Sequence, residues 1–331
     1  MRKIKYTQEI AEKHLNLFGD CIKRKDMMWK EWREDVLNLN PTTNAVFPVE
    51  FGAVLTASTE ELVTMFAYYY DHRKDKFIKD TRADLRKIFN YSNWQPKIAN
   101  FFMQYAEELG VHTCFYCETS YINKYEDRNN KDRNHFDLDH FLPKTLCPIV
   151  GLSIRNLIPS CTVCNEKLKR GHILGFSNTE ETISDKKDEI IKMFPSSENY
   201  SFDSDVNIRI EPVRKEDFTR TLRLQNQPER YAIQFECTDE KTPYLNEIDL
   251  FCLEERYNYH KMEALRLYDL LNDYPPELLQ KVSELFQDKN ADDIKEDLFG
   301  LSFSSSQHRC FNKMKQDIAK LFKGKGQQFL G

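Results

Sequence analysis

The stretch FDLDHFLPK, residues 136–144, places two aspartates and a histidine within one short segment. A histidine such as His140 can accept a proton near neutral pH, as a general base must. A carboxylate such as Asp139 is a hard oxygen ligand for a divalent cation such as Mg²⁺. Alternation of apolar and acidic residues predicts a β-strand here. The segment therefore offers a base and a metal ligand side by side.

Strand geometry limits how these side chains can cooperate. Neighbouring residues of a regular strand face opposite sides, so Asp139 and His140 would not both point into one site. Pro143 indicates that the strand ends there, which would relax the constraint. Asp137 shares the side of Asp139 by alternation, and it is therefore the alternative carboxylate.

Two Cys-x-x-Cys pairs flank this strand, Cys114 with Cys117 and Cys161 with Cys164. Four thiolates with this local spacing have the ligand count of a structural zinc site, which would join segments far apart in sequence. The alternative is four unrelated core or redox cysteines. A closed tetrathiolate site leaves no open coordination position, so we expect this zinc to be structural rather than catalytic.

The segment after the second cysteine pair supplies further polar groups. Asn165 offers a neutral oxygen ligand from a helix predicted to start after Cys164. A strand with Asp and His, a turn, and a helix with Asn would hold one metal beside one base, which suits phosphodiester hydrolysis. Basic residues around this segment form a local positive surface for phosphate contact: Lys144, Arg155, Lys167, Lys169 and Arg170.

The whole composition constrains the class of protein. The net charge is -5, so any contact with nucleic acid must come from a local basic patch. No apolar run approaches the roughly 18 residues of a membrane-spanning helix, and the charged N-terminus lacks a secretory signal. We therefore expect a cytoplasmic protein without membrane contact, in which nine cysteines are not a disulfide framework.

Three sequence blocks, CFYCE, FDLDHFLPK and RNLIPSCTVCNEKLKRG, together resemble the HNH endonuclease family, whose core is a ββα-metal unit. Within that family they are similar to the bacterial anti-phage HNH nucleases of the Septu system and of retron-associated defence units. The resemblance covers about residues 112–172.

The resemblance implies a role for each matching residue. Asp139 and Asn165 would bind a catalytic Mg²⁺ or Mn²⁺, with Asn165 in place of a frequent histidine, and His140 would be the general base. Asn156 would orient the base through backbone hydrogen bonds. The family commonly has a lysine three residues after the asparagine that corresponds to Asn165, and this chain has Leu168 at that position. Phosphate contact is therefore assigned to four residues: Lys144, Lys167, Lys169 and Arg170.

The rest of the chain predicts an α+β protein with mainly helical flanks around the small zinc-stapled core. Residues 1–110 form a helical region, in which Ser58 with Glu61 indicates one helix start. Pro96 and Gly110 indicate the beginning and end of another helix. Residues 111–175 are the HNH core, and 176–331 a mixed and then helical region that could dock a partner.

Short strands and long helices are expected after the core. Strand-like runs cover 206–213, 220–226 and 230–237. Helical patterns follow over 247–274, 276–298 and 304–323. The run NEIDLFCLEERYNYHK, 246–261, is similar to a C-terminal helix of the defence nucleases, or is an amphipathic core helix.

Two functions compete at this point. The first is a metal-dependent HNH endonuclease that hydrolyses DNA, acting as the effector of an anti-phage system with a co-encoded ATPase as partner. The second is a zinc-stapled module that binds nucleic acid or protein without cleavage. Asp139, His140 and Asn165 favour the enzyme, because a binding module needs no base beside a hard-metal ligand.

Overall fold

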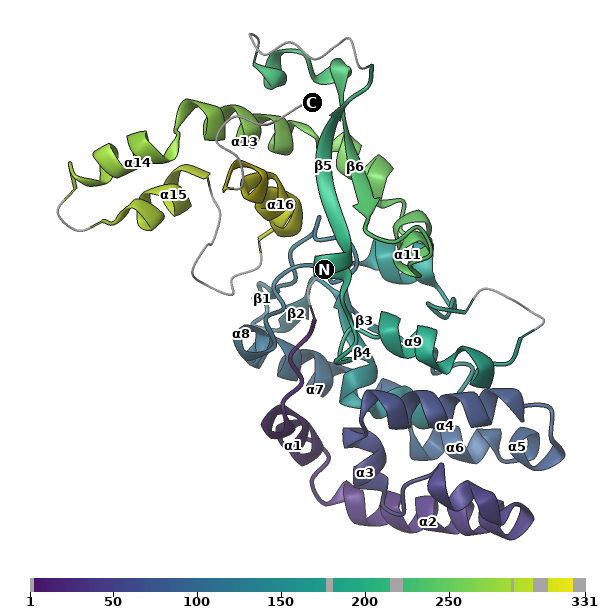
Figure 1. Cartoon of the computed structure of the whole chain (residues 1–331). Helices are drawn as coiled ribbons and strands as arrows, with labels where there is room; N and C mark the ends of the chain where they lie inside the picture. Colours follow the sequence, from purple (N-terminus) through teal and green to yellow (C-terminus); the bar gives the residue numbers. More distant parts are fainter. Residues whose placement is uncertain (1–2, 177–180, 215–222, 287–288, 300–308, 324–331) are drawn as a thin grey trace. The chain divides into compact units, whose positions relative to one another are not determined.

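The computed structural model describes residues 3–176, 181–214, 223–286, 289–299 and 309–323, and all structural statements concern these residues. They form many helices and three small antiparallel sheets of two strands each, so the predicted α+β class is confirmed (Figure 1). The chain divides into two compact units. The first unit is Arg2–Phe115 with Ile122–Ser201, and the second is Tyr116–Tyr121 with Phe202–Gly331.

The first unit opens with a run of helices. Ser58 caps one of them, α4, as predicted: its hydroxyl accepts from the Glu61 N–H at 3.2 Å, and the Glu61 carboxylate accepts from the Ser58 N–H at 2.7 Å. The helices are α1 (Gln8–Asn16), α2 (Cys21–Leu39), α3 (Phe51–Thr56), α4 (Thr59–Asp71), α5 (Lys76–Asp80), α6 (Arg82–Ile88), α7 (Tyr91–Gln104) and α8 (Ala106–Leu109), with a 3₁₀ turn η1 (Pro41–Ala45) after α2.

The start of α7 corrects a sequence expectation. The helix begins at Tyr91, so Pro96 lies inside it rather than at its first turn. The carbonyl that loses a partner at Pro96 belongs to Ser92, which is exposed and can bind water instead. Gly110 ends α8 in the left-handed conformation, at φ 67°, as expected.

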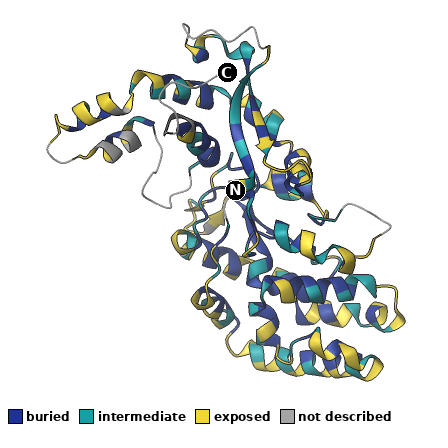
Figure 2. Ribbon diagram, viewed as in Figure 1, coloured by how far each residue is buried: buried dark blue, intermediate teal, exposed yellow. Residues whose placement is uncertain are grey.

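The remaining elements of the first unit follow the helices. Strand β3 (Asp137–His140) pairs antiparallel with β4 (Leu157–Ser160), and both strands are mostly buried (Figure 2). A π-helical segment, η4, follows β4 directly and packs on β3. The other elements are β1 (Lys124–Glu126), β2 (Asp132–Asn134), the 3₁₀ turns η2 (Pro148–Leu152), η3 (Ile154–Asn156) and η5 (Ser184–Lys186), the π-helical segment η4 (Val163–Lys169), and α9 (Lys187–Met193).

The second unit contains one long hairpin. Strand β5 (Val206–Pro212) pairs antiparallel with β6 (Tyr231–Cys237) along its whole length, so two of the three predicted strands are found. The third was wrong over its described part, because Leu224–Asn226 forms the 3₁₀ turn η7. There Asp269 accepts from the backbone N–H groups of Leu224 and Gln225, which a strand would have used in its ladder. Residues 220–222 lie outside the described part.

The helices of the second unit are shorter than the sequence pattern indicated. The predicted helix over 247–274 is three helices, because Cys252 adopts a left-handed conformation at φ 48° and the chain turns again at His260. A helical period can continue across such breaks. The helices are α10 (Phe202–Asp205), α11 (Tyr244–Leu250), α12 (Leu253–Tyr259), α13 (Met262–Asp273), α14 (Pro276–Ser283), α15 (Ala291–Phe299) and α16 (Asn312–Lys323), with a 3₁₀ turn η8 (Pro228–Arg230) before β6. Residues 304–308 of the last predicted helix lie outside the described part.

Candidate active site and cysteine cluster

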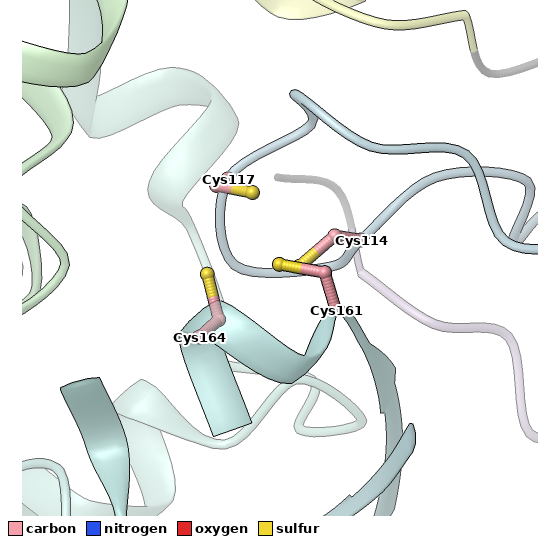
Figure 3. A group of neighbouring side chains, drawn as sticks. All are labelled: Cys114, Cys117, Cys161 and Cys164. Carbon is pink, nitrogen blue, oxygen red and sulfur yellow. The ribbon is translucent and has the colours of Figure 1, made fainter. Parts of the chain in front are cut away.

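The two Cys-x-x-Cys pairs converge. The Sγ atoms of Cys114, Cys117, Cys161 and Cys164 all lie within 4.8 Å of one another (Figure 3). Cys114 and Cys117 come from a turn after α8, while Cys161 directly follows β4 and Cys164 lies in the first turn of η4. Within the described residues these four are the one group of three or more His, Cys, Asp or Glu side chains arranged so closely.

This cluster fits a structural zinc ion. Tetrahedral coordination with Zn–S bonds of about 2.3 Å places the sulfurs about 3.8 Å apart, which is compatible with the observed grouping. Three of the four cysteines are buried and Cys161 is partly exposed. The donor set is all sulfur, as in closed structural sites, so the ion would brace the fold and take no part in hydrolysis.

The turn that carries Cys117 is held by the second unit's own helices. Tyr257 of α12 donates its hydroxyl hydrogen bond to the Cys117 carbonyl at 2.9 Å, and its side chain is fully buried. Glu118, at φ 50°, accepts from the Lys313 N–H of α16 at 2.8 Å. Tyr116 stacks on Phe251, with ring centroids 4.5 Å apart. The segment 246–261 is thus built into the support of this turn.

Asp139 forms a buried ion pair with Lys169. It faces Ile158 across the β3–β4 pair. Lys169, at the end of η4, places Nζ 2.9 Å from one Asp139 carboxylate oxygen and 3.3 Å from the other, and donates to the His140 carbonyl at 2.9 Å. Lys169 is fully buried, so it is a counter-ion of Asp139 in this structure rather than an exposed phosphate contact.

His140 has both ring nitrogens engaged. Its Nε2 lies 3.0 Å from the Gly151 carbonyl oxygen, which can only accept, so Nε2 carries the hydrogen. Its Nδ1 is then the basic nitrogen, and Lys144 Nζ lies 3.3 Å from it. Burial, and after it the charge of Lys144, hold the pKa of His140 well below its usual value. The imidazole is therefore neutral at neutral pH, and Nδ1 is its acceptor nitrogen.

Asn156 fixes the loop that holds His140. Its side-chain amide donates to the Leu142 carbonyl at 3.0 Å and the Val150 carbonyl at 2.9 Å, and its Oδ1 accepts from the Leu142 N–H at 2.7 Å. The residue after Val150 is Gly151, whose carbonyl binds His140 Nε2. Fully buried Asn156 thus ties both ends of the loop that positions the base, through backbone groups alone.

Asp137 and Ser160 carry buried oxygens without partners. They lie opposite each other in the β3–β4 register, on the same side as Asp139 by alternation. Asp137 Oδ2 and Ser160 Oγ are both buried, and neither has a hydrogen-bond partner among the described residues. Buried polar atoms are normally satisfied, and the chemistry of these two oxygens suits binding to a hard cation or a water molecule.

The other candidate residues have distinct surroundings. Asn165 lies partly buried within η4, which packs against β3, the strand of Asp139. Lys144 is partly exposed, and its ammonium lies beside His140. Lys167 and Arg170 are exposed, and Arg170 ends η4 at φ 50°. Arg155 instead donates to the backbone carbonyls of Thr56, Ala57 and Tyr6, and so joins first-unit segments.

Tyr91 is a site residue that sequence reasoning missed. Its ring lies edge-to-face with the His140 ring, with centroids 4.5 Å apart at 81°. Burial and the charges of Asp137 and Asp139 raise the pKa of its phenol, which stays protonated. The sequence pattern predicts a helix that begins at Pro96, which places Tyr91 outside it, and no motif spacing links Tyr91 to the histidine strand.

Comparison with curated proteins finds one similar stretch. The chain is 35% identical over 60 residues to Septu protein PtuB of Bacillus thuringiensis. The stretch is 18% of this chain and 20% of that protein, so the chain spans about a fifth of the length of the curated relative it matches. No protein-family model matches the chain. No solved structure matches it. The similarity indicates a distant, partial relation to a Septu protein.

Among the described helices, none combines the length and the apolar character that a membrane crossing requires.

Proposed function

We propose that this chain is a metal-dependent HNH endonuclease that hydrolyses DNA phosphodiester bonds as the nuclease of an anti-phage defence system. The arrangement of His140 carries the proposal. A buried, neutral imidazole has Nε2 fixed on a backbone carbonyl and Nδ1 turned toward a lysine, on the strand that also carries Asp137 and Asp139. The partial similarity to a Septu protein supports the defence role.

Each site residue has a separate role in the proposed hydrolysis. His140 Nδ1 accepts a proton from the attacking water, while the Gly151 carbonyl keeps the imidazole in the required tautomer. The oxygen of that water then bonds to phosphorus as the bond to the 3′ oxygen breaks. Lys144 and the exposed Lys167 and Arg170 bind phosphate oxygens. Asp139 and Asn165 would hold Mg²⁺ or Mn²⁺, which would supply charge stabilisation at the scissile phosphate.

A zinc-stapled binding module without cleavage activity is the second candidate. Two contacts favour it: Lys169 neutralises Asp139, and Lys144 lies against the basic nitrogen of His140. A nuclease must share or release both contacts when substrate and metal bind. A binding module could keep them permanently as structural interactions.

The proposal extends to partners and location. A Septu-type nuclease would act in the cytoplasm with a partner subunit, which the HNH resemblance indicates is an ATPase encoded alongside. We propose that the C-terminal region, residues 176–331, docks that subunit; its helices α12 and α16 also contact the Cys117 turn.

Plasmid nicking tests the proposal. Supercoiled DNA is incubated with Mg²⁺ or Mn²⁺ and wild type, His140→Ala or His135→Ala, the last an exposed histidine near the same strand. We expect wild type and His135→Ala to nick alike and His140→Ala to be slower by about 10²-fold or more. Equal nicking by His140→Ala would remove His140 from the mechanism. DNA retention in a mobility-shift assay without any nicking by wild type would favour the binding module.

A further inference from the structure

Tyr91 stands at the first position of α7, outside residues 112–172 that carry the HNH resemblance. Its ring contacts two other groups of the first unit, the imidazole of His140 and the ammonium of Lys144. We infer that Tyr91 is a positioning residue, whose ring holds the Lys144 ammonium against Nδ1 of His140. The catalytic consequence of this inference rests on the proposed nuclease function, whereas its structural part does not.

The contacts form a closed triangle. The Tyr91 and His140 rings lie 4.5 Å apart and nearly perpendicular. Lys144 Nζ lies 4.7 Å from the centroid of the Tyr91 ring, within the range of a cation–π contact. The same Nζ lies 3.3 Å from His140 Nδ1. Each member therefore contacts the other two, and the aromatic ring is the rigid one.

The Tyr91 ring can restrict Lys144 because the lysine side chain is flexible. A lysine ammonium on its four-carbon stem prefers full hydration and has several rotamers available. The face of an aromatic ring attracts a cation and limits those rotamers. Lys144 is thereby held where it can bind Nδ1 in the free protein and a phosphate oxygen once substrate arrives. The ring also packs edge-to-face with the buried imidazole.

Two substitutions distinguish the contribution of the Tyr91 ring from that of its hydroxyl. Tyr91→Phe keeps the ring, and Tyr91→Leu removes it. Tyr105 at the C-terminal end of α7 gives a matched control, because Lys13 Nζ lies 4.6 Å from its ring centroid. That position is about 20 Å along the helix axis from Tyr91. Tyr105→Leu therefore removes an equivalent lysine–tyrosine contact away from His140.

Nitrogen NMR of the His140 ring is the first readout, recorded on full-length zinc-loaded protein without DNA. We expect wild type, Tyr91→Phe and Tyr105→Leu to show one tautomer, with the hydrogen on Nε2. In Tyr91→Leu we expect altered Nδ1 and Nε2 shifts that report tautomer exchange. Unchanged shifts in Tyr91→Leu would overturn the inference, and so would equal changes in Tyr91→Phe, because the hydroxyl would then be responsible.

Steady-state cleavage is the second readout. We expect Tyr91→Leu to lower kcat about tenfold or more with a smaller change in KM, and Tyr91→Phe to stay within about threefold of wild type. An unchanged kcat in Tyr91→Leu would overturn the catalytic part. If wild type does not cleave DNA at all, the proposed function fails, while the NMR comparison still decides the role of the ring.

Lys144→Met keeps the experiment decisive if Tyr91→Leu does not fold. It removes the ammonium and leaves the ring in place. Because the ring is inferred to act through Lys144, we expect Lys144→Met to change the His140 ring shifts as well. Where both variants fold, adding Tyr91→Leu to Lys144→Met should produce little further change. Wild-type shifts in Lys144→Met would overturn the inference.

Discussion

Lys169 and Asp139 form an ion pair in which neither side chain is more than a few per cent exposed. Lys169 Nζ contacts both carboxylate oxygens, at 2.9 and 3.3 Å, and also the His140 carbonyl. The Lys169 ammonium is thus paired with the carboxylate that the HNH resemblance assigns as a metal ligand. The pair links the end of η4 to β3, and it makes the stability of this region depend on the charge next to Asp139.

Removal of Lys169 should therefore make the stability of the protein depend on divalent cations. Lys169→Met leaves a buried carboxylate without its counter-ion, and breaking such a pair costs about 3–5 kcal/mol. We expect a lower free energy of unfolding in the absence of divalent cations and partial recovery with Mg²⁺ or Mn²⁺, measured by thermal unfolding. Lys167→Met, an exposed lysine of the same segment, is the control. Destabilisation that Mg²⁺ and Mn²⁺ leave unchanged would argue against a cation at Asp139.

Loss of one cluster cysteine should remove the zinc. Cys161→Ser takes one thiolate from the four that converge, and structural zinc sites contribute on the order of 10 kcal/mol to folding. We expect one zinc per chain in wild type, less in Cys161→Ser, and a lower melting temperature, measured by elemental analysis and calorimetry. Cys21→Ser, at an exposed cysteine outside the cluster, should retain both metal and stability. Full zinc content in Cys161→Ser would refute the assignment.

If Asp137 assists Asp139 in the proposed metal site, substitution of Asp137 should weaken binding of a divalent cation. Its Oδ2 is buried without a hydrogen-bond partner, so Asp137→Asn removes a charge but no observed hydrogen bond of that atom. We expect Mn²⁺ affinity, measured by titration calorimetry on zinc-loaded protein, to fall about tenfold or more with little loss of stability. The exposed Glu126→Gln serves as control. Wild-type affinity in Asp137→Asn would leave Asp139 as the sole carboxylate ligand.

Acid should destabilise the protein partly through His14. Burial lowers the pKa of His14 to about 4, and one ring nitrogen binds the Leu152 carbonyl. The unfolded histidine takes a proton near pH 6.5, so the unfolded state binds more protons between about pH 4 and 6.5. Stability is complete above this window and falls as the pH drops through it, by up to about 3 kcal/mol.

The non-titrating variant His14→Gln isolates this contribution. Its amide can still donate to the Leu152 carbonyl, but it does not accept a proton in either state. Denaturant unfolding at several pH values should show a shallower loss of stability between pH 6.5 and 4 in His14→Gln than in wild type. Parallel curves for the two proteins would show that His14 does not titrate differently on unfolding.

Local chemistry in the sequence was sufficient for several features. The α+β class followed from residue patterns, and the Ser58–Glu61 cap from a four-residue signature. The convergence of Cys114, Cys117, Cys161 and Cys164 followed from the ligand spacing of zinc sites. Each depends on residues whose type is informative at short range, or on a donor set with few other uses.

Only the tertiary structure decided what surrounds the histidine strand. Leu168 left the choice of lysine open, and packing places Lys169 in the interior against Asp139 while Lys167 remains exposed. Asp139 and His140 are neighbours on β3, and buried contacts engage both. Tyr91 reaches His140 from a helix far away in sequence. Residue types fix which groups can bind or titrate, but long-range packing determines which of them meet, and no local pattern records that.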